Sequence, residues 1–243
     1  MKRYLKLKRK IKRRVDNFYW AVFRRDFDRK IKHLREAKLT YLSVEKMRAL
    51  VTEITRIEAN EIKGGMIEAG CALGGSAILL SKLKNQKRDF SVYDVFETIP
   101  APTSEDPSDV HERYEKIASG GAQGLEGDEY YGYQENLYEK VLSNFEREGV
   151  DLETNQVSLV KGLLQDTMKV TGPISFAHID VDWYDPVKVS LERIYPHLSV
   201  GGVIVLDDYY DWGGCRKAVD EFLANNKGVS LDDTAGSLRL YKS

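Results

Sequence analysis

The sequence has little cysteine and no long hydrophobic run. Its two cysteines, Cys71 and Cys215, belong to no CxxC or Cys/His cluster, which argues against a disulfide framework and fits unpaired thiols in a reducing compartment. No stretch approaches the roughly 18 to 20 apolar residues that a transmembrane helix needs, and the N-terminus lacks the apolar core of a signal peptide. We therefore expect a cytoplasmic protein.

A large net charge is also missing, although the charges are unevenly distributed. The 243 residues have a net charge of −1 and are 42% apolar, which suits one large α/β domain. Residues 1–33 contain 14 Lys or Arg and 3 Asp or Glu, and subtracting this +11 from −1 leaves −12 for the rest. Apolar residues at helical spacing predict a basic amphipathic helical extension over residues 1–38: Ile11, Val15, Phe18, Val22, Phe23, Phe27, Ile31 and Leu34.

Three roles are open for this basic extension. In the first, the helix packs on its own domain or on a second subunit of a homo-oligomer, and its lysines are in solvent. Alternatively, residues 1–33 dock on an anionic membrane surface, where each Lys or Arg contributes about 1 kcal/mol, and the protein is then peripheral to the inner face of the membrane. Nucleic acid is the least favoured partner, because the acidic body would repel phosphates.

Strand and helix patterns alternate through residues 39–243, which we interpret as one domain. This alternation predicts an α/β fold with a Rossmann-like, doubly wound and mostly parallel sheet. Residues 97–137 are rich in Pro, Gly and Tyr and predict a partly helical lid insertion. We expect helices over 39–60, where Ser43 can cap the N-terminus, 138–149, 185–196 and 214–226, a strand, turn and helix over 64–84, and strands over 88–96, 156–162, 174–182, 202–208 and 237–242.

A glycine-rich turn follows the first predicted strand. In "EAGCALGGS", Gly70, Gly74 and Gly75 leave room for the backbone to approach a ligand. The spacing matches neither G-x-G-x-x-G nor a P-loop, which disfavours a dinucleotide and a P-loop nucleotide. Asp94 ends the following strand, where an acidic residue can accept hydrogen bonds from a ribose. The alternative is that the glycines serve only a tight turn and that Asp94 caps a loop.

Two later strands both end in carboxylates, in "HIDVDWYDP" (178–186) and "VLDDYYDW" (205–212). Ligands of open α/β sheets bind outside the carboxyl ends of strands, and neighbouring strands lie about 4.8 Å apart. Asp180 could therefore share one ion with Asp207 and Asp208, because carboxylates that close repel each other unless a cation or protons intervene. An all-oxygen site without thiol or imidazole predicts Mg²⁺, Ca²⁺ or Mn²⁺ rather than zinc.

The motifs together resemble the macrocin and mycinamicin O-methyltransferase family over roughly residues 40–243: "MIEAGCALGGSA", "VYDVFETIPAP", "VKGLLQDTM", "FAHIDVDWYDPV", "YPHLSVGGVIVLDDY" and "CRKAVDEF". The resemblance implies a class I S-adenosylmethionine-dependent methyltransferase with a seven-stranded sheet, which acts with a divalent metal, usually Mg²⁺, on a sugar hydroxyl. It implies a metal on Asp180, Asp207 and Asp208. The cofactor would contact Glu68, Gly70, Gly74, Gly75, Ser76, Asp94 and Asp166. "CAL" at 71–73 departs from the bulkier and basic residues expected there.

The chemistry agrees with this resemblance. A sulfonium methyl is already activated, so the enzyme must improve the nucleophile and align it. A metal-bound alcohol becomes more acidic, and a vicinal diol could chelate the ion. Asp180 would act through the metal, and Asp182 and His178 are candidate bases, with a buried structural role as the alternative for His178. Lid tyrosines could stack on the sugar ring of a small-molecule or glycan acceptor: Tyr130, Tyr131 and Tyr133.

Functions from different classes remain open at this point. The first is a metal-dependent O-methyltransferase acting on a glycoside or glycan, and the second is the same catalyst acting on a catechol-like aromatic diol. A non-catalytic cofactor-binding module and a nicotinamide-dependent dehydrogenase are further alternatives. The carboxylates on both strand ends argue against lost catalysis, and the glycine spacing argues against the dehydrogenase.

Overall fold

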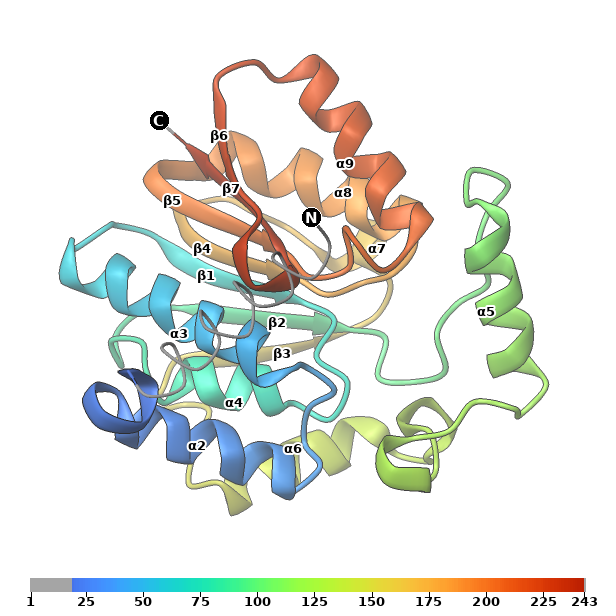
Figure 1. Cartoon of the computed structure of the whole chain (residues 1–243), viewed down its shortest axis with the longest axis horizontal. Coiled ribbons are helices and arrows are strands. Elements are labelled where there is room, and N and C mark those ends of the chain that lie inside the picture. The colour runs from blue at the N-terminus through green and yellow to red at the C-terminus, as the bar shows by residue number, and fades with distance from the viewer. Residues whose placement is uncertain (1–18, 243) are drawn as a thin grey trace, which may run out of the picture.

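A seven-stranded sheet forms the centre of the molecule in the computed structural model, which describes residues 19–242 (Figure 1). The strand order is β3-β2-β1-β4-β5-β7-β6. All pairings from β3 to β5 are parallel, and β7 runs antiparallel to both β5 and β6. The predicted mostly parallel sheet is therefore confirmed. The strands are β1 Gly65–Ala69, β2 Phe90–Asp94, β3 Val157–Lys161, β4 Ile174–Ile179, β5 Leu198–Leu206, β6 Val229–Asp232 and β7 Leu238–Lys242.

Helices cover both faces of the sheet and bury two separate cores. Because successive strand residues point to opposite faces, Met66 of β1 enters one core and Ile67 enters the other. The first face carries α2 Arg25–Glu36, α3 Val44–Ala59, α4 Gly75–Ser81 and α6 Leu137–Arg147. The second carries α7 Leu164–Thr167, α8 Tyr184–Ile194 and α9 Gly213–Asn225. The arrangement is doubly wound, as the alternation predicted.

The predicted N-terminal helix is bent within the described residues. Residues 19–23 are helical, and a bend at Arg24, with φ −126° and ψ 29°, separates them from α2. Ile31 and Leu34 are buried as an apolar stripe predicts, whereas Val22 and Phe23 are 52% and 70% exposed. Because of the bend, these two side chains do not continue the apolar face that Ile31 and Leu34 form on α2. The predicted stripe residues Ile11, Val15 and Phe18 lie outside the described part of the chain.

A buried ion pair holds α2 on the body. The Asp28 carboxylate accepts a hydrogen bond from Arg48 Nε of α3 at 3.1 Å and pairs with Lys32 Nζ at 2.9 Å. Burial alone would raise the pKa of Asp28, but these cations outweigh it and lower the pKa. The predicted division of the chain at residue 38 stays a prediction. The ion pair joins α2, which precedes residue 38, to α3, which follows it. Ser43 caps α3 as predicted, since its Oγ accepts from Lys46 N at 3.1 Å.

The segment between β2 and α6 stands beside the sheet rather than on it. It contains α5 Ser108–Ala118 and short turns at Leu125–Gly127 and Tyr131–Tyr133, so it is partly helical, as predicted (Figure 1). The Tyr133 hydroxyl donates to the carbonyl of Ile117 and accepts from Ala122 N. Tyr133 therefore ties the segment to itself. We keep the term lid for residues 97–137.

Gly75 at the start of α4 touches the chain that leads into α3. Its N–H donates to the carbonyl of Leu39 at 2.9 Å. A Cβ at this position would lie 2.3 Å from the same oxygen and 2.8 Å from Thr40 Cβ. No side chain fits there, so close packing rather than helix propensity decides this residue.

Gly75→Ala should therefore lower the free energy of unfolding by about 1 to 3 kcal/mol, because overpacking a tight contact outweighs the roughly 1 kcal/mol that alanine gains over glycine in a helix. Gly172→Ala is the matched control, since a Cβ there meets nothing within 4 Å. Urea unfolding monitored by circular dichroism measures both. Equal stability of the two variants would contradict the packing argument.

Candidate functional site

A cavity of about 470 Å³ opens at the carboxyl ends of β1, β2, β4 and β5. This is where the strand order reverses between β1 and β4, the position at which open α/β sheets bind ligands. The volume lies in the range of small-molecule sites, roughly 300 to 1,000 Å³. Its wall combines the glycine turn, five strand-end aspartates and aromatic residues, among them Gly70, Asp94, Asp180, Asp182, Asp207 and Asp208.

The glycine turn is pressed against the end of β4. Gly70 has φ +83°, and a Cβ on it would lie 2.0 Å from the carbonyl oxygen of Asp180. Asp180 N in turn donates to the carbonyl of Ala69 at 2.8 Å. The sequence argument assigned this glycine to a ligand, and the structure shows that the protein backbone alone already requires it.

Asp94 takes the capping role considered for it, and it also lines the cavity. Its Oδ2 accepts hydrogen bonds from Cys71 N at 2.7 Å and Ala72 N at 3.2 Å, and its Oδ1 accepts from Phe96 N at 2.8 Å. Burial raises the pKa of Asp94, and these backbone donors act against the rise. Asp94 thus caps the glycine turn and also lines the cavity, where its contact with a ribose stays a prediction.

The other predicted cofactor residues do not line the cavity. Glu68 is fully buried in β1. A Cβ at Gly74 would meet Val141 Cγ1 at 3.2 Å, which gives that glycine a packing role like that of Gly75. Ser76 is buried inside α4. Asp166 is exposed on α7, directly after the cavity residue Gln165, so its contact with a cofactor remains a prediction.

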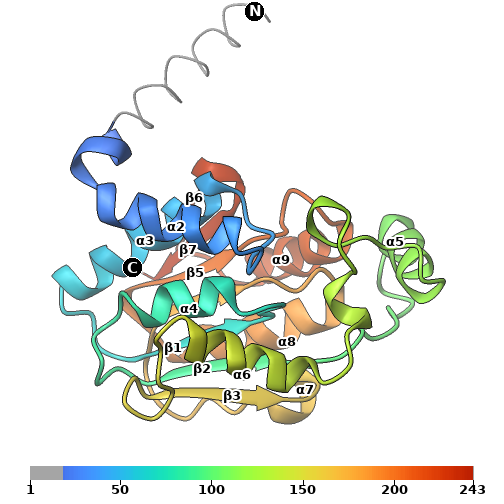
Figure 2. The same cartoon turned by 90° about the horizontal axis from the view of Figure 1, so that it is seen from below.

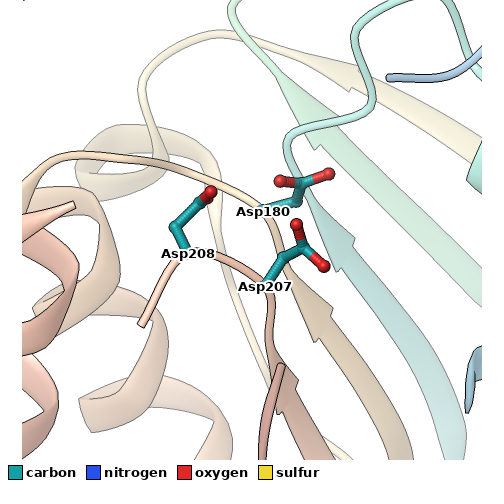
Figure 3. A group of neighbouring side chains, drawn as sticks. All are labelled: Asp180, Asp207 and Asp208. Carbon is teal, nitrogen blue, oxygen red and sulfur yellow. The ribbon is translucent and has the colours of Figure 1, made fainter. Parts of the chain in front are cut away.

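Asp180, Asp207 and Asp208 converge at the ends of β4 and β5 (Figure 3). One carboxylate oxygen of each lies within 4.8 Å of the others. The strands hold them there, because Asp207 N donates to the carbonyl of Ile179 at 2.9 Å. Asp208 Oδ2 is buried without a hydrogen-bond partner. The sequence argument from neighbouring strand ends thus predicted correctly that these three carboxylates lie close together.

This carboxylate cluster fits a hard divalent cation. Mg²⁺ and Ca²⁺ bind carboxylate oxygens at about 2.0 to 2.6 Å, so one ion can reach ligand atoms that are less than about 5 Å apart. The buried oxygen of Asp208 would gain a ligand it otherwise lacks. The cluster contains no thiol, which favours Mg²⁺, Ca²⁺ or Mn²⁺ over zinc.

Crowding of negative charge changes the proton affinity of the cluster. Burial and the neighbouring Asp207 raise the pKa of Asp180 to about 8. Burial together with Asp182 and Asp180 raises the pKa of Asp208 well above its usual value. Burial also raises the pKa of Asp182 to about 6, although a hydrogen bond with Asp208 and the charge of Arg113 oppose it. Without a cation, protons must therefore separate these groups.

Lys46 is a cluster residue that the sequence argument missed. Its Nζ donates to Asp207 Oδ2 at 2.8 Å, to Asp207 O at 3.1 Å and to Asp211 Oδ2 at 2.8 Å. Burial alone would raise the pKa of Asp207, but His178 and Lys46 outweigh it and the pKa is lowered. Lys46 lies one turn into α3, next to the apolar face that begins at Met47, and no motif marked it.

His178 lies beneath the cavity rather than in it. Its side chain has no exposed surface, and its Nδ1 is 2.7 Å from Glu68 Oε1. Its Nε2 is 4.0 Å from Asp207 Oδ1. Burial would lower the pKa of His178, yet the neighbouring carboxylates of Asp207 and Glu68 raise it to about 10. We therefore correct the prediction that His178 is a catalytic base in favour of the alternative, a buried structural role. His178 can reach an acceptor only through Asp207.

Aromatic side chains from the lid and from both acidic strand ends form the rest of the wall. The rings of Tyr130 and Tyr131 lie 4.5 Å apart, and Tyr41 lies 5.6 Å from Tyr131. Trp183 and Trp212 line the same cavity, with ring centroids 6.4 Å apart. The sequence argument named the two lid tyrosines but missed both tryptophans, although each directly follows an acidic strand end.

Comparison with known proteins identifies relatives over most of the chain. The family model described as Macrocin-O-methyltransferase (TylF) matches residues 23–232. Demethyldecarbamoylnovobiocin O-methyltransferase of Streptomyces niveus is 26% identical over 196 residues, which are 76% of this chain and 68% of that protein. The 8-demethyl-8-(2,3-dimethoxy-alpha-L-rhamnosyl)-tetracenomycin-C 4'-O-methyltransferase of Streptomyces olivaceus is 28% identical over 189 residues, or 75% of this chain and 67% of that protein.

Solved structures share the fold. The O-methyltransferase NovP superposes with a TM-score of 0.68 at 23% identity, covering 84% of this chain and 82% of NovP. An O-methyltransferase from Bacillus cereus in complex with SAH superposes with a TM-score of 0.55 at 14% identity, covering 94% and 97%. These neighbours confirm the predicted Rossmann-like fold of class I methyltransferases.

The pKa values of the cluster predict how the cation should stabilise the protein. The pKa of Asp180 is about 8 in the folded protein, against an ordinary value of 3.8. Without metal, the folded protein therefore holds a proton on Asp180 that the unfolded chain has lost, and the stability that this proton provides falls as the pH rises toward 8. A divalent cation replaces that proton. The rise in melting temperature on adding excess Mg²⁺ should therefore be larger at about pH 8 than at about pH 6.

Differential scanning fluorimetry at the two pH values checks this prediction. Asp208→Asn should shrink the Mg²⁺-induced rise, whereas Asp220→Asn on α9, outside the cluster, should not. A rise of the same size at both pH values, or in both variants, would contradict cation binding by these carboxylates.

Proposed function

The chain belongs to the macrocin O-methyltransferase family, whose model spans residues 23–232, and on this premise we propose that it methylates a metal-bound sugar hydroxyl of a glycoside or glycan with S-adenosylmethionine. Family membership makes the protein an O-methyltransferase. It sets aside the non-catalytic module and the dehydrogenase. The observation that carries the metal-dependent proposal is the carboxylate cluster with its unpartnered oxygen on Asp208.

The methyl donor would lie over the glycine turn. Asp94 lines the cavity, and its Oδ1, which accepts a single backbone hydrogen bond, keeps a second lone pair for a ribose hydroxyl. Gly70 lies between Asp94 and Asp180 in the wall, so a donor seated on Asp94 extends toward the carboxylate cluster. A fold neighbour in complex with SAH, the demethylated donor, supports a donor of this kind.

The carboxylate cluster would orient the acceptor. A divalent ion bound there acts as a Lewis acid that lowers the pKa of a coordinated hydroxyl. Asp180, Asp207 and Asp208 supply the oxygens, and Lys46 holds Asp207 in position through two hydrogen bonds. His178 supports the same carboxylate from below. Lys46 and His178 thus both hold the Asp207 carboxylate from the face of the sheet that α3 covers.

Asp182 is the residue best placed to take the hydroxyl proton. It lines the cavity two residues beyond Asp180, and its pKa of about 6 lies close to neutral pH, as a general base requires. The acceptor oxygen forms its bond to the methyl carbon while the carbon–sulfur bond breaks. The proton passes to Asp182, and the sulfonium becomes a neutral thioether.

The aromatic wall suits the apolar faces of a sugar ring. Tyr41, Tyr130 and Tyr131 form one group of contacting rings in the wall, and Trp183 and Trp212 form a second. The printed name of one relative places its methyl group on a rhamnosyl 4'-oxygen, which supports a glycoside acceptor here. A catechol-like diol could chelate an ion in the same way and belongs in the same acceptor screen.

Asp94→Asn should weaken SAH binding by about 1.5 to 3 kcal/mol, the range for hydrogen bonds to a charged group. Isothermal titration with SAH measures it, and circular dichroism verifies that the turn still folds. Asp185→Asn, a carboxylate elsewhere in the same wall, is the matched control and should bind SAH as the unmodified protein does. An unchanged dissociation constant for Asp94→Asn would remove Asp94 from the donor site.

Asp208→Asn should reduce methyl transfer by about 100-fold or more, beyond the 10- to 100-fold typical of residues that only support a metal ligand. Its SAH affinity should stay unchanged, because the ion serves the acceptor. The assay follows radiolabelled methyl transfer from S-adenosylmethionine to rhamnosides and catechols, with and without EDTA. Full activity in EDTA would show that the proposed metal is not required.

A further inference from the structure

The first described residues expose an apolar ridge. Tyr19, Val22 and Phe23 are 46%, 52% and 70% exposed. The rings of Tyr19 and Phe23 lie 5.5 Å apart, so the two side chains share one face of the helical turn. Three large apolar side chains within five residues are more than the scattered exposure that a surface normally shows.

The body of the protein fixes the direction of this ridge. Trp20, on the opposite side of the turn, is only 8% exposed, and the Arg48 guanidinium lies 5.3 Å from the centroid of its ring. Arg48 is itself paired with Asp28 of α2. Burial of Trp20 therefore keeps Val22 and Phe23 directed away from the body.

Positive charge flanks the ridge in the sequence. Residues 1–18 contain nine Lys or Arg and a single acidic residue, Asp16, and Arg24 and Arg25 follow the ridge directly. Arg25 is exposed and forms no ion pair with the described residues. The remainder of the chain, from residue 34 onward, is acidic, with −12. The family model begins only at residue 23, so the methyltransferase family does not account for this basic segment.

We propose that residues 19–25, which we call the head face, dock on an anionic lipid bilayer surface, and that the basic sequence before them adds to the attraction. Lys and Arg side chains pair with the lipid headgroups, while Tyr19, Val22 and Phe23 enter the boundary between headgroups and acyl chains. Nucleic acid would supply the anions but no apolar phase for Val22 and Phe23. None of the described helices is long and apolar enough to span a bilayer, and the proposed contact is peripheral.

This docking leaves the cavity accessible. Figures 1 and 2 both show the blue start of the described chain at the end of the molecule opposite α5 and the lid. The cavity lies at the carboxyl ends of the strands, on the lid side. A bilayer bound to the head face therefore does not cover the cavity entrance, and the proposal is independent of which acceptor the enzyme methylates.

Co-sedimentation of the full chain with vesicles tests the proposal. The vesicles are phosphatidylcholine alone or phosphatidylcholine mixed with phosphatidylglycerol, at low and at high salt. One variant combines Val22→Ser and Phe23→Ser, and a second replaces Lys8, Arg9, Lys10 and Lys12 by Gln. Val200→Ser is the matched control, because Val200 is 71% exposed but belongs to β5 rather than to the head face.

We expect binding to the anionic vesicles only, weakened about tenfold or more by the serine pair through loss of buried apolar area. The glutamine variant should lose the salt-sensitive part of binding, and Val200→Ser should bind normally. Absence of sedimentation at low salt, or binding that the serine pair leaves unchanged, would overturn the proposal. Equal binding to a DNA duplex independent of Phe23 would point to polyanions, and a vesicle-free dimer broken by the glutamine variant would point to a second copy.

Discussion

Repulsion among buried carboxylates at the ends of β4 and β5 is the constraint on which the rest of the site depends. Three aspartates with oxygens within 4.8 Å of one another cannot all be ionised without a compensating charge. Two compensating groups lie within the protein, Lys46 above Asp207 and His178 below it. Both act on Asp207 rather than Asp208, whose Oδ2 remains without a partner. The protein thus compensates the negative charge of Asp207, and in our proposal a divalent cation compensates the remaining negative charge of the cluster.

The sheet and the cluster could be predicted from sequence because each depends on a local pattern. Alternating strand and helix segments define a parallel sheet, and parallel strands end at one edge. Carboxylates that follow two such strands must then meet if the strands are neighbours, as Asp180 and Asp207 do. The short strand β6 was missed because its residues are half-exposed or exposed and show no apolar run.

Other features depend on contacts between distant segments, which no local pattern encodes. Lys46 and Asp207 are 161 positions apart in the sequence. The bend at Arg24 interrupts a continuous apolar pattern, so the pattern alone does not predict it. The glycines of the turn were assigned to a ligand. Gly70 and Gly75 are instead required by the carbonyl oxygens of Asp180 and Leu39, which a Cβ would overlap. The same close contacts place the turn, and with it Asp94, beside the carboxylate cluster.

The most direct test of the account is to locate the cation. Crystals grown with SAH and Mn²⁺, which binds carboxylates as Mg²⁺ does and scatters anomalously, would show its position. The account predicts one anomalous peak at about 2.0 to 2.6 Å from an oxygen of Asp180, Asp207 and Asp208 together. A cluster without an anomalous peak, with Lys46 and water completing its hydrogen bonds, would contradict metal-assisted methyl transfer by this chain.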